Sequence, residues 1–357
     1  MKRLILIIVV LALAAGAIYF YRTTKTDPAT NEDIIKIGVI LPLSGNNAII
    51  GTQLKEGLDL ITATQNYDKS FMFIFEDDQM QAARTSAIAN KFANIDKVDA
   101  IITYASQPAA IVAPIATEHG IIQFANASDV TFTKYDGNYA FAPSPEHEMR
   151  TLLNAIKKRG YQKIALITAN EAYSNLAESN VKKLTPQMDL EIVYQAKVNP
   201  SDRDFKMLIS KAETTKPDIY IIQTWEPVLD ILVTQLKQVA PEKPFTAAYA
   251  FFLSMNPELF EGQFCLNIGS NNEDYQKLFY QHYQKNPEQM SAVGFAETDL
   301  MLKAMSKMKN WNEFYDELKK AAQEESILGS LTINGQQINY QPIIQEFRNG
   351  KPVTLPQ

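Results

Sequence analysis

The sequence predicts an α/β protein made of two similar lobes, each with a parallel sheet covered by helices. Apolar runs alternate with helical patterns from Ile34 onward, and most of these runs are apolar throughout, as strands buried on both faces are. The two halves of the chain also share a sequence pattern. At 357 residues the chain has the length of two ordinary domains.

Composition and charge narrow the class of protein. Hydrophobic residues make up 46% of the chain and charged residues 21%, which is typical of a globular protein. The net charge of −6, from 34 basic and 40 acidic residues, argues against nucleic acid as a partner. Cys265 is the only cysteine, so an internal disulfide and a cysteine-based metal cluster are both excluded.

Residues 1–33 indicate export. The apolar run 4–21 follows a basic start and, as a helix, spans about 27 Å, close to the ~30 Å hydrocarbon core of a bilayer. It is either a signal peptide cut at residues 15–17 or a retained transmembrane anchor. The aromatic cluster at 19–21 favours the anchor, because a cleaved signal is usually small and polar there. Residues 23–33 are polar and predict a tether.

The body then alternates strands and helices. The first expected strand, 34–41, ends at Pro42, and an open loop leads to a helix over 52–65. A strand at 71–77 precedes a helix over 81–95, and a later helix over 148–160 (EMRTLLNAIKKRG) ends on a glycine. The other expected strands are 99–105, 121–125, 163–169, 190–198, 218–224, 245–251 and 264–269.

The two halves share a pattern. KIGVILPLSGNNAIIGTQLKEGL, from Lys36, is similar to KIALITANEAYSNLAESNVKKL, from Lys163. In each half a Lys-x-Asp then precedes an apolar strand, at 97–103 and at 216–224. All βαβ units share some of this pattern, but the matched spacing favours two Rossmann-like lobes. Because such folds bind ligands at the carboxyl ends of their strands, we expect a site in the cleft between the lobes.

Motifs of catalysis are missing from the sequence. It has no dinucleotide-binding glycine motif, no phosphate loop and no nucleophile elbow. His119, His147 and His282 stand at no metal-ligand spacing. The acidic run 76–78 closes a strand and favours a helix cap over a metal site. We therefore expect a binding protein without cofactor or metal, and an enzyme on a flavodoxin-like fold is disfavoured.

An ordered set of segments resembles one family. The landmarks include IKIGVILPLSGNNAIIG, FEDDQMQAARTSAIANKFANIDKVDAIIT, YASQPAAIVAPIATEHG, ANASDVTFT, NEAYSNLA, DRDFKMLISKAETTKPDIYII and ILGSLTINGQQINYQPIIQEFRNGKPV. In this order they resemble the periplasmic substrate-binding proteins of ABC transporters, in the branched-chain amino acid (Leu/Ile/Val-binding) family, from about Ile34 to Val353.

The resemblance implies the type I periplasmic-binding-protein fold, with two lobes joined by three crossover segments. Lobe one is expected at 34–141 plus 268–327, and lobe two at 142–267 plus 328–357. The implied function is an extracytoplasmic solute-binding protein, a monomer, that closes on a ligand by hinge motion and delivers it to a membrane permease. A ligand-sensing receptor with the same fold remains the alternative.

The resemblance also suggests ligand-binding residues. Ser106 matches a serine that grips the ligand's carboxylate at a helix N-terminus, although a plain helix-cap serine is the alternative. Tyr173 and Trp225 fall where aromatic residues face the ligand, and an interfacial core residue is the alternative for Trp225. The full expected set is Ser106, Gln107, Asn126, Ala127, Ser128, Tyr173, Trp225 and Tyr249.

One departure from the family bears on the ligand. Amino-acid binders place an acid just after the strand that here reads FTAAYAFF, to pair with the ligand's ammonium group, but Tyr249 or a neighbour stands there. The helix start Tyr-Asp-Ala is likewise replaced by Phe-Ala-Glu, ending at Glu297. Burying an ammonium group without a countercharge costs several kcal/mol. We therefore expect an organic acid, an amide or an aromatic compound between Tyr173 and Trp225, with Glu226 as the alternative partner of an ammonium group.

Overall fold

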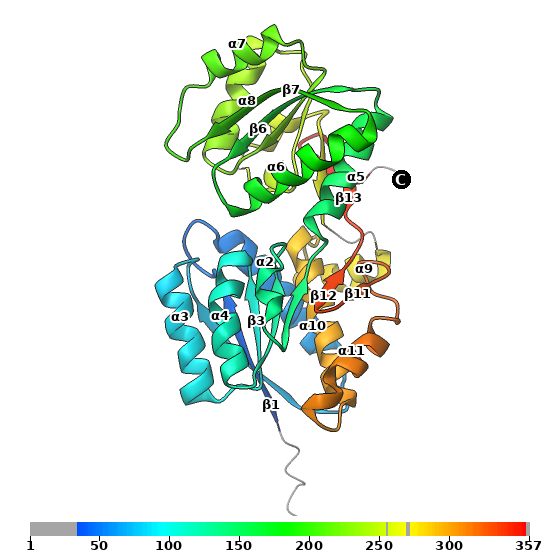
Figure 1. The fold of residues 1–357 in the computed structure, drawn as a ribbon. Helices are drawn as coiled ribbons and strands as arrows, with labels where there is room; N and C mark the ends of the chain where they lie inside the picture. Colours follow the sequence, from blue (N-terminus) through cyan, green and yellow to red (C-terminus); the bar gives the residue numbers. More distant parts are fainter. Residues whose placement is uncertain (1–33, 255, 269–271, 355–357) are drawn as a thin grey trace, which may run out of the picture.

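The computed structural model describes residues 34–254, 256–268 and 272–354. The expected anchor and tether at 1–33 therefore lie outside the described residues. Within the described residues, no helix has both the length and the apolar character needed to cross a membrane. The chain forms two lobes, one above the other in Figure 1, each built around its own parallel sheet.

Lobe one contains a seven-stranded sheet in the order β11-β12-β5-β4-β3-β1-β2. All neighbours are parallel except β11 and β12, which are antiparallel. The strands are β1 (Ile35–Leu41), β2 (Phe71–Asp77), β3 (Ala100–Tyr104), β4 (Ile122–Asn126), β5 (Asn138–Phe141), β11 (Thr332–Asn334) and β12 (Gln337–Asn339).

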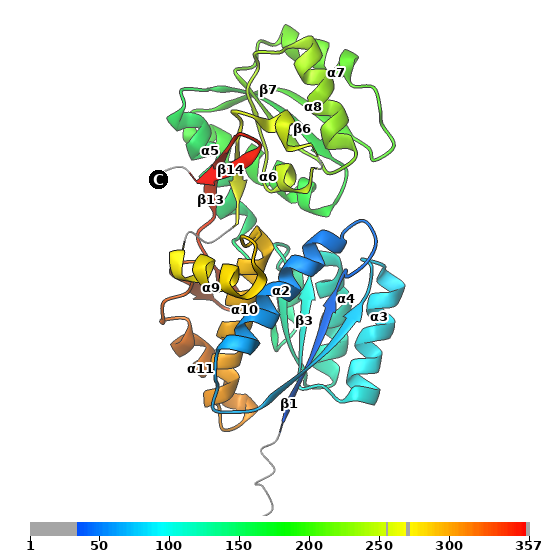
Figure 2. The ribbon, with the colours of Figure 1, turned by 180° about the vertical axis from the view of Figure 1, so that it is seen from behind.

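Helices cover both faces of this sheet, as the apolar strands predict. Val39 faces the core formed with α2 (Ala48–Thr64) and α10 (Gln289–Lys307), while the next residue, Ile40, faces the core formed with α3 (Ala82–Lys91) and α4 (Ser106–Glu118). Figure 1 shows the side with α3 and α4, and Figure 2 the side with α2, α9 and α10. The helices are α2 (Ala48–Thr64), α3 (Ala82–Lys91), α4 (Ser106–Glu118), α9 (Glu273–Tyr283), α10 (Gln289–Lys307) and α11 (Phe314–Ala321). Short turns are the π-helix η1 (Phe92–Asp96) and the 3-10 helices η2 (Thr131–Lys134) and η6 (Trp311–Glu313).

Lobe two contains a parallel sheet in the order β7-β6-β8-β9 and an antiparallel sheet in the order β10-β13-β14. The strands are β6 (Lys163–Ala169), β7 (Glu191–Val198), β8 (Ile219–Gln223), β9 (Phe245–Thr246), β10 (Phe264–Asn267), β13 (Ile343–Arg348) and β14 (Lys351–Thr354). The helices are α5 (Pro145–Lys158), α6 (Ala172–Leu184), α7 (Lys206–Thr214) and α8 (Val228–Val239), with 3-10 helices η3 (Thr185–Met188), η4 (Ala250–Leu253) and η5 (Pro257–Phe260).

The chain passes between the lobes three times, which confirms the expected crossovers. It leaves lobe one between β5 and α5, returns between β10 and α9, and leaves again between β12 and β13. One expected boundary is wrong. Residues 328–357 were expected to lie wholly in lobe two, but β11 and β12 complete the lobe-one sheet. Ile338 on β12 is fully buried in the lobe-one core, and this burial holds the hairpin there.

Two expected elements differ in the structure. The strand expected at 245–251 ends at Thr246, because Tyr249 adopts a left-handed conformation with φ of 64° that turns the chain into η4. The helix expected from Glu148 begins earlier, at Pro145. Ser144 caps it by accepting a hydrogen bond of 3.3 Å from the backbone N–H of His147.

Candidate functional site

The site lies where the carboxyl ends of the strands of both sheets approach the junction of the lobes (Figure 1). From lobe one come Ser106, just after β3, and the loop that follows β4. From lobe two come Tyr173, after β6, and Trp225, after β8. The fold therefore brings together residues that the sequence selected from distant segments.

A buried acid, Glu148, lies at the centre of this group. It stands in the first turn of α5 and is 0% exposed. Its Oε1 accepts hydrogen bonds from the hydroxyl of Tyr249 at 2.6 Å and from that of Ser128 at 3.4 Å. Its Oε2 accepts one from the hydroxyl of Tyr173 at 2.8 Å. One carboxyl group thus connects two tyrosines of lobe two with the β4 loop of lobe one.

Burial changes the acidity of this cluster. It raises the pKa of Glu148 to about 7, although the hydrogen bonds from Tyr249, Tyr173 and Ser128 oppose the change. Burial and the nearby Glu148 also raise the pKa of Tyr173 and Tyr249 well above the usual value. Near neutral pH both hydroxyls therefore keep their hydrogens, while Glu148 exchanges between its neutral and ionised forms.

Three half-buried aromatic side chains, Tyr173, Trp225 and Tyr249, form what we call the aromatic wall. The ring centroid of Tyr173 lies 5.9 Å from that of Trp225 and 5.9 Å from that of Tyr249. Glu171 fixes the wall to the start of α6. It accepts hydrogen bonds from the indole Nε1 of Trp225 at 3.1 Å and from the backbone N–H groups of Tyr173 at 3.1 Å and Ser174 at 2.6 Å. The wall is therefore held by hydrogen bonds to Glu171, with part of its surface open.

On the lobe-one side, Ser106 begins α4 directly after Ala105, whose φ is 71°. The Ser106 hydroxyl oxygen accepts a hydrogen bond of 3.3 Å from the backbone N–H of Asp129, which joins α4 to the loop after β4. Gln107, the next expected residue, is exposed. Ser128 on this loop reaches Glu148, and Ser106 is joined to the loop at the next residue, Asp129.

Two of the expected residues have side chains that contact the interior of lobe one. Asn126 is 6% exposed, and its Nδ2 donates a hydrogen bond of 3.0 Å to the carbonyl oxygen of Phe141. Ala127 packs in a small apolar cluster with Ala113 and Phe132. Their side chains stabilise the loop that carries Ser128.

The sequence reasoning missed Glu148, although a signal for it existed. An acid in the first turn of a helix is usually explained by the helix dipole. Glu148 shares the apolar stripe of its helix, however, with Leu152 and Ala155 at spacings of four and seven residues. An acid on the buried face of an amphipathic helix predicts a polar partner, and here the partners are the hydroxyls of two tyrosines and Ser128.

Glu226, the alternative acid, lies beside Asp230, and its buried Oε1 has no hydrogen-bond partner among the described residues. Burial and a hydrogen bond with Asp230 raise its pKa to about 8. Asp230 in turn accepts hydrogen bonds from Ser254 at 2.7 Å and from Asn256 at 2.5 Å. Glu226 thus pairs with a second carboxyl group, whereas Glu148 contacts the aromatic wall directly.

A second buried acid lies behind the site in lobe one. Glu297 on α10 is 1% exposed, and among the described residues nothing forms a hydrogen bond with its Oε1. It borders a cavity of about 10 Å³, the space of a single water molecule, together with Leu41 and Thr103 near the ends of β1 and β3. Burial raises the pKa of Glu297 well above its usual value.

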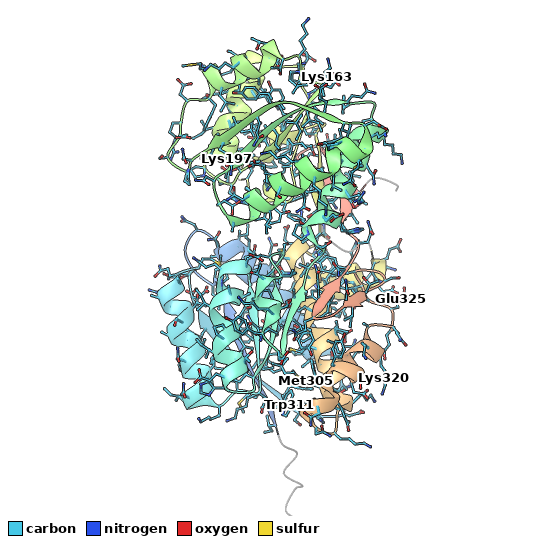
Figure 3. All side chains as sticks on the ribbon, viewed as in Figure 1. Lys163, Lys197, Met305, Trp311, Lys320 and Glu325 are labelled. Atoms are coloured by element: carbon cyan, nitrogen blue, oxygen red, sulfur yellow. The ribbon has the colours of Figure 1, made fainter. Side chains whose placement is uncertain are left out.

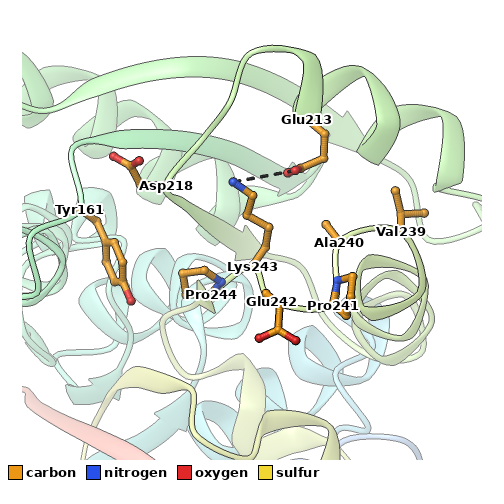
Figure 4. A pocket seen from close by; sticks show the side chains of 9 residues that line it. All are labelled: Tyr161, Glu213, Asp218, Val239, Ala240, Pro241, Glu242, Lys243 and Pro244. Carbon is orange, nitrogen blue, oxygen red and sulfur yellow. Dashed lines mark ion pairs between the residues drawn. The ribbon is translucent and has the colours of Figure 1, made fainter.

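A large surface hollow of about 450 Å³ lies at the other end of the lobe-two strands (Figure 4). Asp218 and Pro244, which border it, precede β8 and β9, whereas Trp225 follows β8. Several of its polar groups already have partners: Lys243 pairs with Glu213 at 3.8 Å, and Asp218 accepts hydrogen bonds from the backbone N–H groups of Gln162 and Lys163. The hollow is thus separate from the candidate site. No group of three or more possible metal ligands occurs in the described part of the chain.

Comparisons with known proteins agree with this architecture. A curated relative, the Leu/Ile/Val-binding protein homolog 2 of Brucella abortus (strain 2308), is 24% identical over 213 residues, and the match spans only 57% of each chain. A leucine-binding protein LivK from Thermotoga maritima superposes with a TM-score of 0.81 at 18% identity, covering 90% of this chain and 98% of that one.

Two further solved structures share the fold. The substrate-binding protein LivJ from Streptococcus pneumoniae, in complex with isoleucine, has a TM-score of 0.79 at 18% identity and covers 90% and 100% of the two chains. A solute-binding protein of an ABC transporter from R. palustris, in complex with benzoate, has a TM-score of 0.75 at 18% identity and covers 90% and 95%. The family model described as periplasmic binding protein matches residues 34–343. The chain therefore belongs to the periplasmic binding protein family.

Proposed function

We propose that this protein is an extracytoplasmic solute-binding protein that captures a small molecule between its lobes and delivers it to the permease of an ABC transporter. The observation that carries the proposal is the cluster around Glu148. It joins the aromatic wall of lobe two to the β4 loop of lobe one at the carboxyl ends of both sheets. Membership in a family of binding proteins supports it.

The ligand we propose is a small amino acid-like compound or an aromatic or other organic acid. The wall offers flat apolar surface for a side chain or a ring. Ser106 and the first backbone N–H groups of α4 suit a carboxylate, since a helix N-terminus attracts anions. Related folds have been solved with isoleucine and with benzoate, which fits both branches of this class.

Location and partners follow from the same proposal. The protein acts outside the cytoplasm, tethered by its N-terminal segment, as a monomer with the permease as its partner. A ligand-sensing receptor would use the same site. Copurification with permease subunits from native membranes distinguishes the two roles, because only a transport component binds a permease.

A screen of ligands by thermal denaturation tests the function. Isoleucine, leucine, benzoate and 4-hydroxybenzoate are suitable probes, and a ligand at 100 times its Kd adds about 2.7 kcal/mol to stability. We expect at least one probe or a close analogue to raise the Tm. Calorimetry then gives its Kd.

Two tryptophan variants place the binding site. Trp225→Ala removes stacking surface, so we expect it to weaken binding at least tenfold. Trp311→Ala is the matched control, because Trp311 lies at the end of lobe one away from lobe two (Figure 3). Equal affinity of Trp225→Ala and the native chain would show that the ligand binds elsewhere.

A further inference from the structure

We propose that Glu148 is a positioning residue that determines whether the tyrosine hydroxyls of the aromatic wall accept or donate hydrogen bonds to a ligand. The site therefore selects ligands that present N–H or O–H donors, and it releases a proton when it binds them. The inference deepens the proposed function and rests on it, since it requires a ligand against the wall. It also revises the expectation of a ligand without an ammonium group, which assumed that the site holds no acid.

The first step is the direction of the hydroxyl hydrogens. A tyrosine hydroxyl has one hydrogen, and an ionised carboxylate only accepts. When Glu148 is ionised, the hydrogens of Tyr173 and Tyr249 both point at it, over 2.8 Å and 2.6 Å. The remaining lone pairs of the two phenolic oxygens are then free to accept hydrogen bonds from a ligand.

The second step is what a ligand touches. Glu148 is 0% exposed, whereas Tyr173 and Tyr249 each keep part of their surface open. A ligand therefore contacts the tyrosines and not the carboxyl group. Glu148 acts through them, and its negative charge strengthens both phenolic oxygens as acceptors because charge-assisted hydrogen bonds polarise their donors.

Protonation reverses part of this pattern. A neutral Glu148 carries one O–H, and the oxygens placed to accept it belong to Tyr173, Tyr249 and Ser128. When a tyrosine accepts that hydrogen, its own hydrogen turns away from Glu148. The wall then presents a donor where it had presented an acceptor, and a ligand's N–H or O–H group loses its partner.

The surroundings leave the negative charge of Glu148 unpaired. The groups facing it are hydroxyls: Tyr173 from α6, Tyr249 before η4 and Ser128 after β4, with the phenol of Tyr340 after β12 also within electrostatic range. Among the described residues Glu148 takes part in no ion pair.

The charged side chains near Glu148 form ion pairs with other residues. On its own helix, Glu146 pairs with Arg150 at 2.9 Å and with Lys183 at 2.6 Å. On β13, which packs against α5, Arg348 pairs with Glu346 at 2.7 Å. A cationic or donor-rich ligand end is thus the group that stabilises ionised Glu148, and the pKa of about 7 lets binding release a proton near neutral pH.

The test compares the native chain with Glu148→Gln, and Glu146→Gln is the control from the same helix turn. Isoleucine and its deaminated counterpart 3-methylpentanoate are one pair of probes; 4-hydroxybenzoate and benzoate are the other. Calorimetry at pH 7 in phosphate and in Tris counts the protons exchanged. For the donor-bearing probe that binds, we expect proton release and an apparent Kd that weakens up to about tenfold per pH unit below pH 7.

Glu148→Gln fixes an amide that donates to one tyrosine at every pH. We expect this variant to abolish proton release and to make the Kd independent of pH. It should weaken binding of the donor-bearing probe at least tenfold and change binding of the donor-free probe little. Tyr249→Phe, which keeps the ring and loses one acceptor, should show part of the same loss. An unchanged pH profile in Glu148→Gln overturns the inference.

Infrared difference spectra between pH 5.5 and 8.5 separate this inference from the proposed function, because they need no ligand. A carboxyl band that titrates near pH 7 in the native chain and is lost in Glu148→Gln supports the inference. Its absence from the native chain overturns it. If Glu148 titrates near pH 7 but the chain binds no small molecule, the proposed function is overturned. The proposed selection of ligands is then overturned as well.

Discussion

Two buried acids, Glu148 and Glu297, have very different surroundings. Glu148 has three hydroxyl partners, whereas the Oε1 of Glu297 has none among the described residues. A buried polar group without a partner costs roughly 1–3 kcal/mol. The buried Oε1 of Glu297 therefore costs stability, and it lies beside a cavity with room for one water molecule.

Replacing Glu297 by glutamine should make stability less dependent on pH. The pKa of Glu297 in the folded chain is raised, so the folded state holds a proton that the unfolded state has lost at neutral pH. Stability then falls as pH rises above the ordinary pKa of glutamate. We expect Glu297→Gln to match the native chain near pH 4.5 and to exceed it by roughly 1–3 kcal/mol at pH 8.

Urea denaturation at several pH values measures this difference. Glu324→Gln is the control, because Glu324 is exposed and pairs with Lys303 at the surface. Parallel pH profiles for Glu297→Gln and the native chain would show that Glu297 does not carry a raised pKa.

At the residue scale, the sequence selected the wall but not the acid behind it. Trp225 comes two residues after β8 and Tyr173 lies in the first turn of α6, and the family resemblance points to both. Glu148 contacts residues 25 and 101 positions away in the chain. Such pairing depends on how α5 packs on lobe two, which a strand and helix pattern does not specify.

At the scale of elements, long segments were predictable and short ones were not. The sequence predicts β1, β2 and β6, because each is a continuous apolar run between clear turns. It does not predict β5 or the hairpin of β11 and β12, whose strands have three or four residues and whose burial comes from neighbours distant in sequence. Tyr249 ended β9 early through its backbone conformation, which the side-chain pattern does not encode.

The contact between α2 and α10 depends on two glycines. A Cβ added at Gly57 would lie 1.9 Å from the carbonyl oxygen of Ser291, and one added at Gly294 would lie 2.2 Å from that of Leu54. Both neighbours are backbone atoms, so neither contact is relieved by turning a side chain. The two helices can therefore approach this closely only because neither Gly57 nor Gly294 has a side chain.

Gly57→Ala and Gly294→Ala should each destabilise lobe one. Forcing the helices apart disrupts the apolar core between them and outweighs the better helix propensity of alanine; we expect a loss of roughly 2–4 kcal/mol for each. Thr52→Ala, at an exposed position of α2, is the control and should change stability by less than about 0.5 kcal/mol. Chemical denaturation gives the values. A Gly57→Ala chain as stable as the control would mean that the two helices separate at little cost.

At the scale of the whole molecule, the crossovers between the lobes are tied to each other. The backbone N–H of Ser144, in the first crossover, donates a hydrogen bond of 2.9 Å to the side chain of Asn339, at the start of the third. A ring nitrogen of His147 lies 3.0 Å from the Oε1 of Gln341. These contacts keep the connecting segments together, so the lobes are expected to rotate about them as rigid bodies rather than to separate.

Ligand should therefore make the molecule more compact. A ligand held by the aromatic wall of lobe two and by the α4 start of lobe one contacts both lobes only when they approach, and it shifts the population toward the closed form by its differential affinity. Small-angle X-ray scattering should show a smaller radius of gyration when the ligand found by denaturation screening is added at saturation. At a ligand concentration just sufficient to saturate the native chain, Trp225→Ala should close less completely, because it loses part of the contact from lobe two, while Trp311→Ala should close normally. A ligand that saturates the native chain and leaves its scattering curve unchanged would mean that binding uses one lobe alone, and hinge closure would have to be abandoned as the means of capture.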